Sequence, residues 1–140
     1  MRLYHATLVE KVISMLRRTM SVKRNAQRQD DATLVRHIYD VYCILKTEER
    51  ADYLDLKTLA PLFKTVLEED VKRFGNQHAE FVSNPKQELT LGLKELEENP
   101  AFRQRFQDFV TPMVFNTEPH DFDTCFVSFK NVAESLITTI

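Results

Sequence analysis

The sequence has very little glycine, with Gly75 and Gly92 as its only two. Phosphate-binding loops, dinucleotide-binding turns and the sharp turn that carries a hydrolase serine all need glycine at fixed positions. Two isolated glycines cannot supply any of these motifs, so the enzyme classes that depend on them are excluded. Tight hairpins also rely on glycine, and the composition therefore favours helices over sheets.

Cysteine and long apolar runs are scarce as well. Cys43 and Cys125 are the only cysteines and form no CxxC pair, so the sequence offers neither a disulfide framework nor a zinc site. The four histidines are scattered and form no HExxH motif. No stretch of about 18 uninterrupted apolar residues occurs. We expect a cytoplasmic protein without a membrane span, whose two cysteines are buried as small apolar side chains.

Charge is distributed unevenly along the chain, although the net charge is only −2. Residues 1–50 contain ten Lys and Arg against six Asp and Glu, whereas residues 51–140 contain nine against fifteen. A phosphate-bearing partner would prefer the first third of the chain. The alternative is that this excess is an ordinary solvated surface.

Apolar residues recur at helical spacing along the chain, which predicts an all-α protein with a single helical domain of about five helices over residues 1–140. The first helix is expected over about residues 5–20, and residues 21–31 are expected to form a flexible linker. The second helix should begin at a cap provided by Asp31 and end near residue 47. It is apolar nearly all round, as is typical of a central helix or of one pressed between two partners.

A third helix is expected over about residues 59–71. It would have Pro61 in its first turn and Gly75 as its stop. Residues 76–85 are expected to form a loop, because apolar residues are rare in this segment.

Three further segments carry helical signals. Residues 88–98 have helical periodicity, and Asn99 followed by Pro100 is typical of a cap and first turn. The helix that starts there should kink or end at Pro112. A last helix is expected from about residue 122 to residue 138.

A short cluster of potential metal ligands precedes the last helix. Asp121 and Asp123 form a D-x-D pair between His120 and Cys125, and two such carboxylates can position a divalent ion. A helix start at residue 122 also needs an N-cap, and aspartate is a preferred one. We favour capping over metal binding and assign no metal site.

Charged residues on the first two helices allow both a structural and a functional interpretation. Lys11 lies on the shoulder of the first helix, with Arg18 further along it, and Arg36 and Asp40 are one turn apart on the second. Taken by themselves, Lys11 and Arg18 read as a solvated surface and the Arg36–Asp40 pair as a structural ion pair.

The surroundings of these residues resemble two helical motifs of the AbiEii/AbiGii nucleotidyltransferase toxin family. Residues 7–11 match a Thr-x-x-Glu-Lys segment, and residues 36–42 match an Arg-His-x-Tyr-Asp-x-Tyr segment. The similarity continues through the aromatic segment at residues 109–115 and the closing helix. It spans most of the chain and concerns the C-terminal helical part of the family.

The resemblance implies roles for four residues. Lys11 would contact nucleotide phosphates and would belong, with Asp40, to the catalytic centre. Arg18 and Arg36 would be further substrate-binding residues. The implied reaction transfers a nucleotide from a nucleoside triphosphate, with magnesium, to an RNA or protein acceptor. A cognate antitoxin and an RNA acceptor are the implied partners.

The chain also departs from the family pattern. Family members begin with a Gly-Ser motif and a D-x-D pair on a strand, which hold nucleotide and magnesium, and this sequence contains no Gly-Ser pair. The residues at 121–123 lie at the opposite end. We expect this chain alone to be inactive and to bind no cofactor, and to need an N-terminal nucleotidyltransferase domain or a partner chain, as in a fragment or split gene. The alternative is a non-catalytic helical interaction module.

Overall fold

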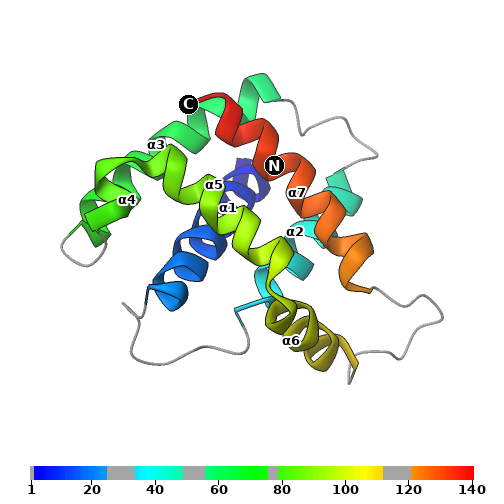
Figure 1. The fold of residues 1–140 in the computed structure, drawn as a ribbon. Helices are drawn as coiled ribbons and strands as arrows, with labels where there is room; N and C mark the ends of the chain where they lie inside the picture. The colour runs from blue at the N-terminus through cyan, green and yellow to red at the C-terminus, as the bar shows by residue number, and fades with distance from the viewer. Residues whose placement is uncertain (1, 25–33, 49–55, 76–78, 112–120) are drawn as a thin grey trace.

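A computed structural model describes residues 2–24, 34–48, 56–75, 79–111 and 121–140. Within these ranges the chain forms seven α-helices and no strand, which confirms the predicted all-α class and exceeds the predicted helix count (Figure 1). The helices are α1 (Arg2–Lys23), α2 (Arg36–Glu48), α3 (Leu56–Phe74), α4 (Ala79–Ser83), α5 (Pro85–Glu98), α6 (Pro100–Val110) and α7 (Phe122–Thr138).

The central element is α1, which packs against α2, α3 and α5. Figure 1 shows α5 crossing α1, with α7 passing beside α2. The second helix is not the central one: α2 packs against α1 and α7, and these two partners account for its apolar character nearly all round. The buried apolar residues of α1 are Leu8, Val9, Val12, Ile13, Met15, Leu16 and Met20.

The crossing of α1 and α5 is close because α5 carries Gly92 at this point. A Cβ atom at Gly92 would lie 2.7 Å from the backbone oxygen of Leu16. Such a contact is too short for a real side chain, so the missing side chain lets the two backbones approach. One of the two glycines thus has a packing role rather than a turn role.

The first helix is longer than predicted. Because α1 continues through Lys23, residues 21–23 are helical and do not belong to the predicted linker. Ser21 is 3% exposed, and Arg24 binds the buried Glu88 of α5, so tertiary contacts hold this polar end in place. The rest of the predicted linker, with Asp31 as its cap, lies outside the described residues.

The third helix begins earlier than expected, at Leu56. Pro61 consequently lies inside α3 instead of in its first turn. Gly75 follows the last helical residue, as predicted.

The predicted loop at residues 76–85 is wrong in part, because α4 occupies residues 79–83. Phe81 is 1% exposed and anchors this short helix beside α5. Asn84 then caps α5 by accepting a hydrogen bond from the backbone N–H of Gln87 at 3.1 Å, and Pro85 is the first residue of that helix. Residues 76–78 lie outside the described part.

The predicted starts of α6 and α7 are confirmed. Asn99 accepts a hydrogen bond from the backbone N–H of Ala101 at 3.0 Å, and Asp121 accepts one from that of Thr124 at 2.8 Å. Asp121 is therefore a helix cap, as favoured over metal binding. The helix α6 ends at Val110, and Pro112 lies outside the described residues.

Aromatic residues supply the largest side chains of the single core. Of the two cysteines, Cys125 is fully buried as predicted and Cys43 is half-buried. Among the described helices, none has the length and apolar character needed to cross a membrane. The largest fully buried phenylalanines are Phe63, Phe81, Phe106, Phe122 and Phe129.

Candidate functional site

Lys11 of α1 and Asp40 of α2 form an ion pair, with 2.9 Å between Nζ and Oδ2. Both side chains are partly buried, each with 26% of its surface exposed. The two residues singled out from the sequence are thus brought together although 29 positions separate them. An ammonium group has three donors and this pair uses one, so Lys11 can also bind a ligand from the solvent side.

The local sequence places this pair at the rim of the contact between α1 and α2. Lys11 directly precedes Val12, and Asp40 directly precedes Val41, and both valines are fully buried. Neighbouring positions on a helix point about 100° apart, so each charged residue lies beside the buried face of its own helix. Packing of the two apolar faces therefore fixes the distance between the two charges.

Two further predicted cations lie on the same helices. Arg36 stands one turn before Asp40, with Nε 3.8 Å from Oδ2, so the expected pairing of these residues is confirmed. Its side chain is 62% exposed. Arg18 lies two turns beyond Lys11, about 10 Å along α1, and its charge acts on His37 of α2.

His37 is a residue of this site that sequence reasoning missed. Its imidazole Nδ1 is buried and has no hydrogen-bond partner among the described residues. Burial, followed by the positive charges of Lys11 and Arg18, lowers its pKa to about 4. The imidazole is therefore neutral at pH 7. Its place three residues before Asp40 in the Arg-His-x-Tyr-Asp-x-Tyr segment was the signal that could have identified it.

The cysteines offer no nucleophile here. Burial raises the pKa of the Cys125 thiol to about 12, and burial also raises that of Cys43. Since the thiolate is the reactive form, both thiols are unreactive at neutral pH. The charged pair and the neutral imidazole are the groups left for chemistry between α1 and α2.

The described residues contain no ready-made site that could hold a magnesium ion by itself. In the ranges that the structure describes, no three His, Cys, Asp or Glu side chains come together as a metal-binding group. Asp40 is a single carboxylate and is already bound to Lys11. Magnesium is usually held by one or two carboxylates together with substrate phosphates. No step through magnesium is therefore assigned to these residues.

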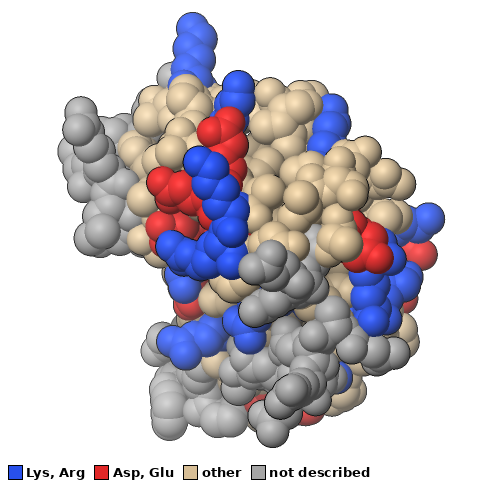
Figure 2. All heavy atoms as spheres, turned by 90° about the vertical axis from the view of Figure 1, so that its left-hand side faces the viewer, with Lys and Arg blue, Asp and Glu red and all other residues tan. Residues whose placement is uncertain are grey.

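The positive charge of the second half of α1 is largely neutralised by α3 and α5. Lys11, in the first half of α1, is likewise paired, with Asp40 of α2. Figure 2 shows the same intermixing on one face, where acidic and basic side chains lie next to one another. The pairs are Arg17–Asp70 at 3.1 Å, Lys23–Glu95 at 3.0 Å and Arg24–Glu88 at 2.9 Å.

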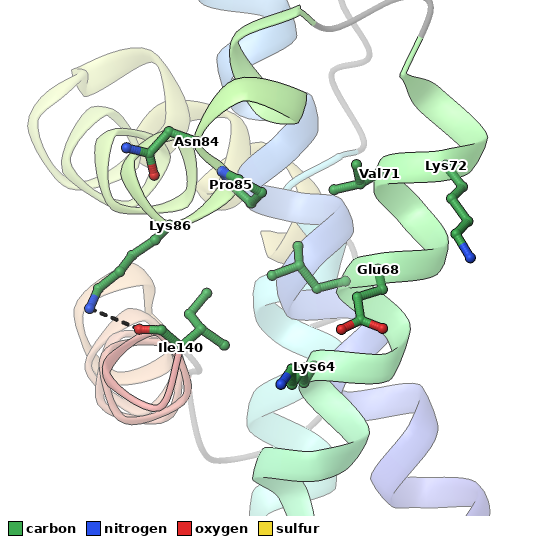
Figure 3. A pocket seen from close by; sticks show the side chains of 9 residues that line it. Lys64, Glu68, Val71, Lys72, Asn84, Pro85, Lys86 and Ile140 are labelled. Carbon is green, nitrogen blue, oxygen red and sulfur yellow. Dashed lines mark hydrogen bonds between the residues drawn. The ribbon is translucent and has the colours of Figure 1, made fainter.

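A groove elsewhere on the surface is separate from this pair. It has a volume of about 520 Å³ and lies between α3, the start of α5 and the C-terminal Ile140. Its apolar lining includes Val71 and Pro85, and Lys86 donates a hydrogen bond to the Ile140 backbone oxygen at 3.0 Å beside it (Figure 3). None of the residues predicted to act on nucleotide lines it.

Comparison with known families gives a match that covers most of the chain. The family described as "Nucleotidyl transferase AbiEii toxin, Type IV TA system" matches residues 4–128, which include Lys11, Arg36 and Asp40. No curated protein and no solved structure matches the chain. Because the match covers most of its length, the chain belongs to the AbiEii nucleotidyltransferase toxin family.

Proposed function

We propose that this chain forms the helical part of a nucleotidyltransferase toxin, in which Lys11 binds the phosphates of a nucleoside triphosphate. The ion pair between Lys11 and Asp40 carries this proposal, because it joins two helices within the stretch that the family matches. The reaction would transfer a nucleotide to an RNA or protein acceptor. A further domain or partner chain would supply the Gly-Ser and D-x-D motifs, which this sequence lacks.

The charges around the pair support a phosphate ligand. Three cations, Lys11, Arg18 and Arg36, and one carboxylate, Asp40, act on the same imidazole of α2. The Arg36 side chain is 62% exposed and so can move toward a ligand. Nucleotidyl transfer develops charge on phosphate oxygens, and fixed cations stabilise that charge. An ammonium already held by a carboxylate needs little reorganisation when the ligand arrives.

Asp40 would have two successive roles. In the free chain it orients Lys11 through the 2.9 Å contact. Once phosphate binds the ammonium, the carboxylate would be free to accept a hydrogen bond from the acceptor hydroxyl. Arg36, with its Nε 3.8 Å from the same carboxylate oxygen, would hold the Asp40 side chain in place.

Transfer of labelled nucleotide tests this proposal. The chain is assayed alone and together with an AbiEii-family domain that carries the Gly-Ser and D-x-D motifs. Lys11→Met and Asp40→Asn should each lower the transfer rate by about 100-fold, since each removes a charge that acts on the reacting phosphate or acceptor.

Lys23→Met is the matched control. Lys23 lies on the same helix and is paired with Glu95 at 3.0 Å, but it is 55% exposed and far from the charged pair along the helix. Its loss should change the rate less than about twofold. Equal rates for Lys11→Met and Lys23→Met would refute the assignment. Absence of transfer in every combination, with binding to a partner protein retained, would favour a non-catalytic interaction module.

A further inference from the structure

The surroundings of the His37 side chain are unusual for a polar group in a folded protein. Its Nδ1 atom is buried with no hydrogen-bond partner among the described residues, and it is the one such side-chain atom in that part of the chain. Leaving a buried polar atom unpaired costs about 1–3 kcal/mol. Such atoms are rare in folded proteins and often mark positions that serve a ligand.

Charged groups of α1 and of α2 itself act on His37. Lys11 and Arg18 of α1 and Arg36 of α2 disfavour its protonation, whereas Asp40 of α2 favours it. Together with burial, the cations prevail and hold its pKa at about 4. Because three cations lower the pKa of His37, an added negative charge nearby should raise that pKa.

A bound phosphate would reverse this balance. Its negative charge would offset Lys11 and the two arginines, so the penalty for a positive imidazole would fall. The imidazolium has two N–H donors, whereas the neutral ring has one. The additional donor could then serve a phosphate oxygen.

We propose that His37 is a positioning residue for phosphate at this site: it takes up one proton from solvent when a di- or triphosphate binds beside Lys11, and then donates a hydrogen bond to it. This inference rests on the proposed function. No covalent bond forms or breaks in this step, and the proton returns to solvent when the ligand leaves. His37 would thus make binding tighter as the pH falls from neutral toward 5.

Histidine NMR with inorganic triphosphate as the ligand tests the proposal. The signals of the four histidines are followed from pH 5 to pH 8, and His37→Gln identifies that of His37. Without triphosphate the His37 signal should not titrate in this range. With saturating triphosphate its pKa should rise by about two units. Lys23→Met should retain this rise and Lys11→Met should abolish it.

Calorimetry in buffers of different ionisation enthalpy measures the proton directly. At pH 5.5 the wild-type chain should take up a fraction of a proton when triphosphate binds, and His37→Gln should take up none from this position. His37→Gln should also weaken binding at pH 5.5 on the order of fivefold, as expected for one lost hydrogen bond. At pH 8 the two proteins should bind alike.

The outcomes separate the two proposals. Triphosphate binding that depends on Lys11 but leaves His37 unprotonated would overturn the role of His37 and leave the proposed function intact. Equal shifts of all four histidines would overturn it too, since they would indicate a non-specific anion effect. Failure of triphosphate to bind, together with unchanged transfer in Lys11→Met, would overturn both.

Discussion

Lys11 and Arg17 lie on the same helix but differ in how far their side chains are buried. Arg17 is 9% exposed, bound to Asp70 and stacked on the Phe74 ring at 3.7 Å. Burial lowers its pKa, and its contacts leave little room for a ligand. Lys11 keeps 26% of its surface exposed. Arg17 therefore ties α1 to α3, whereas part of the Lys11 side chain stays accessible to solvent.

His37 makes stability depend on pH in the free protein. Its pKa is about 4 when folded and near 6.5 when unfolded, so between these values the unfolded chain binds more protons. Stability contributed by His37 is therefore present above pH 6.5 and is lost as the pH falls toward 4. The loss should be on the order of 2 kcal/mol, after allowing for partial solvent screening.

Urea unfolding at intervals from pH 7.5 to pH 4.5 measures this dependence. The free energy of unfolding of the wild-type chain should fall more steeply than that of His37→Gln, which has no titrating group at this position. Parallel curves for the two proteins would show that the imidazole is not shielded from protons. The size of the offset between the curves reflects packing, and only the difference in their slopes with pH tests the prediction.

Gly92 controls how closely α5 approaches α1. A methyl group at this position would meet the Leu16 backbone oxygen at 2.7 Å, and backbone cannot move aside as a flexible side chain can. Gly92→Ala should therefore destabilise the protein by about 1–3 kcal/mol, although alanine favours helices. Thermal and urea unfolding measure the change.

Lys94→Ala is the matched control on the same helix. Lys94 is exposed, so its replacement by another good helix former should change stability by less than about 0.5 kcal/mol. If Gly92→Ala proved as stable as Lys94→Ala, that result would contradict the close approach of the α1 and α5 backbones.

The start of α7 depends on Asp121. Its carboxylate accepts the Thr124 N–H at 2.8 Å, and hydrogen bonds from Thr124 hold its pKa below the usual range. Asp121→Ala should cost about 1 kcal/mol at neutral pH. Because the folded pKa is lowered, this difference should shrink as the pH falls through that pKa.

Asp123→Ala serves as the comparison for Asp121→Ala. Asp123 is 70% exposed and forms a surface pair with Arg103 at 2.7 Å. Its loss should cost well under 1 kcal/mol by urea unfolding. A larger cost for Asp123 than for Asp121 would contradict the assignment of the cap.

Helix boundaries were predictable where residues next to the boundary in the sequence determine it. The bounds of α7 follow from an aspartate cap and a regular apolar pattern, and Asn99–Pro100 marks the start of α6 in the same way. The end of α1 was missed because polar residues there are held by distant partners, such as Lys23 by Glu95. The helix α4 was missed because its one anchor, Phe81, is isolated in a polar segment.

The candidate site was predictable only in part, for the same reason. Spacing along the chain allowed the Arg36–Asp40 pair, which is local to one helix. The Lys11–Asp40 contact joins two helices, and family resemblance rather than periodicity indicated it. The burial of His37 depends on how α1 packs over α2, which no single-helix pattern reveals.

Charge complementarity between distant segments shapes the whole molecule. The chain is basic in its first third and acidic afterwards, and the fold brings these parts together through α1. Glu88 is only 7% exposed on its side chain, and Arg24 binds it through two hydrogen bonds of 2.9 Å. The uneven charge thus serves the packing of α1 against α3 and α5.

The affinity of the chain for inorganic triphosphate tests the central claim most directly. Calorimetry compares the wild-type chain with Lys11→Met and Lys23→Met at one pH and one salt concentration, after circular dichroism has shown that all three are folded. Lys11→Met should bind at least about tenfold more weakly, and Lys23→Met should bind within about twofold of wild type. Equal affinities for the two variants would contradict a phosphate site at Lys11 and Asp40.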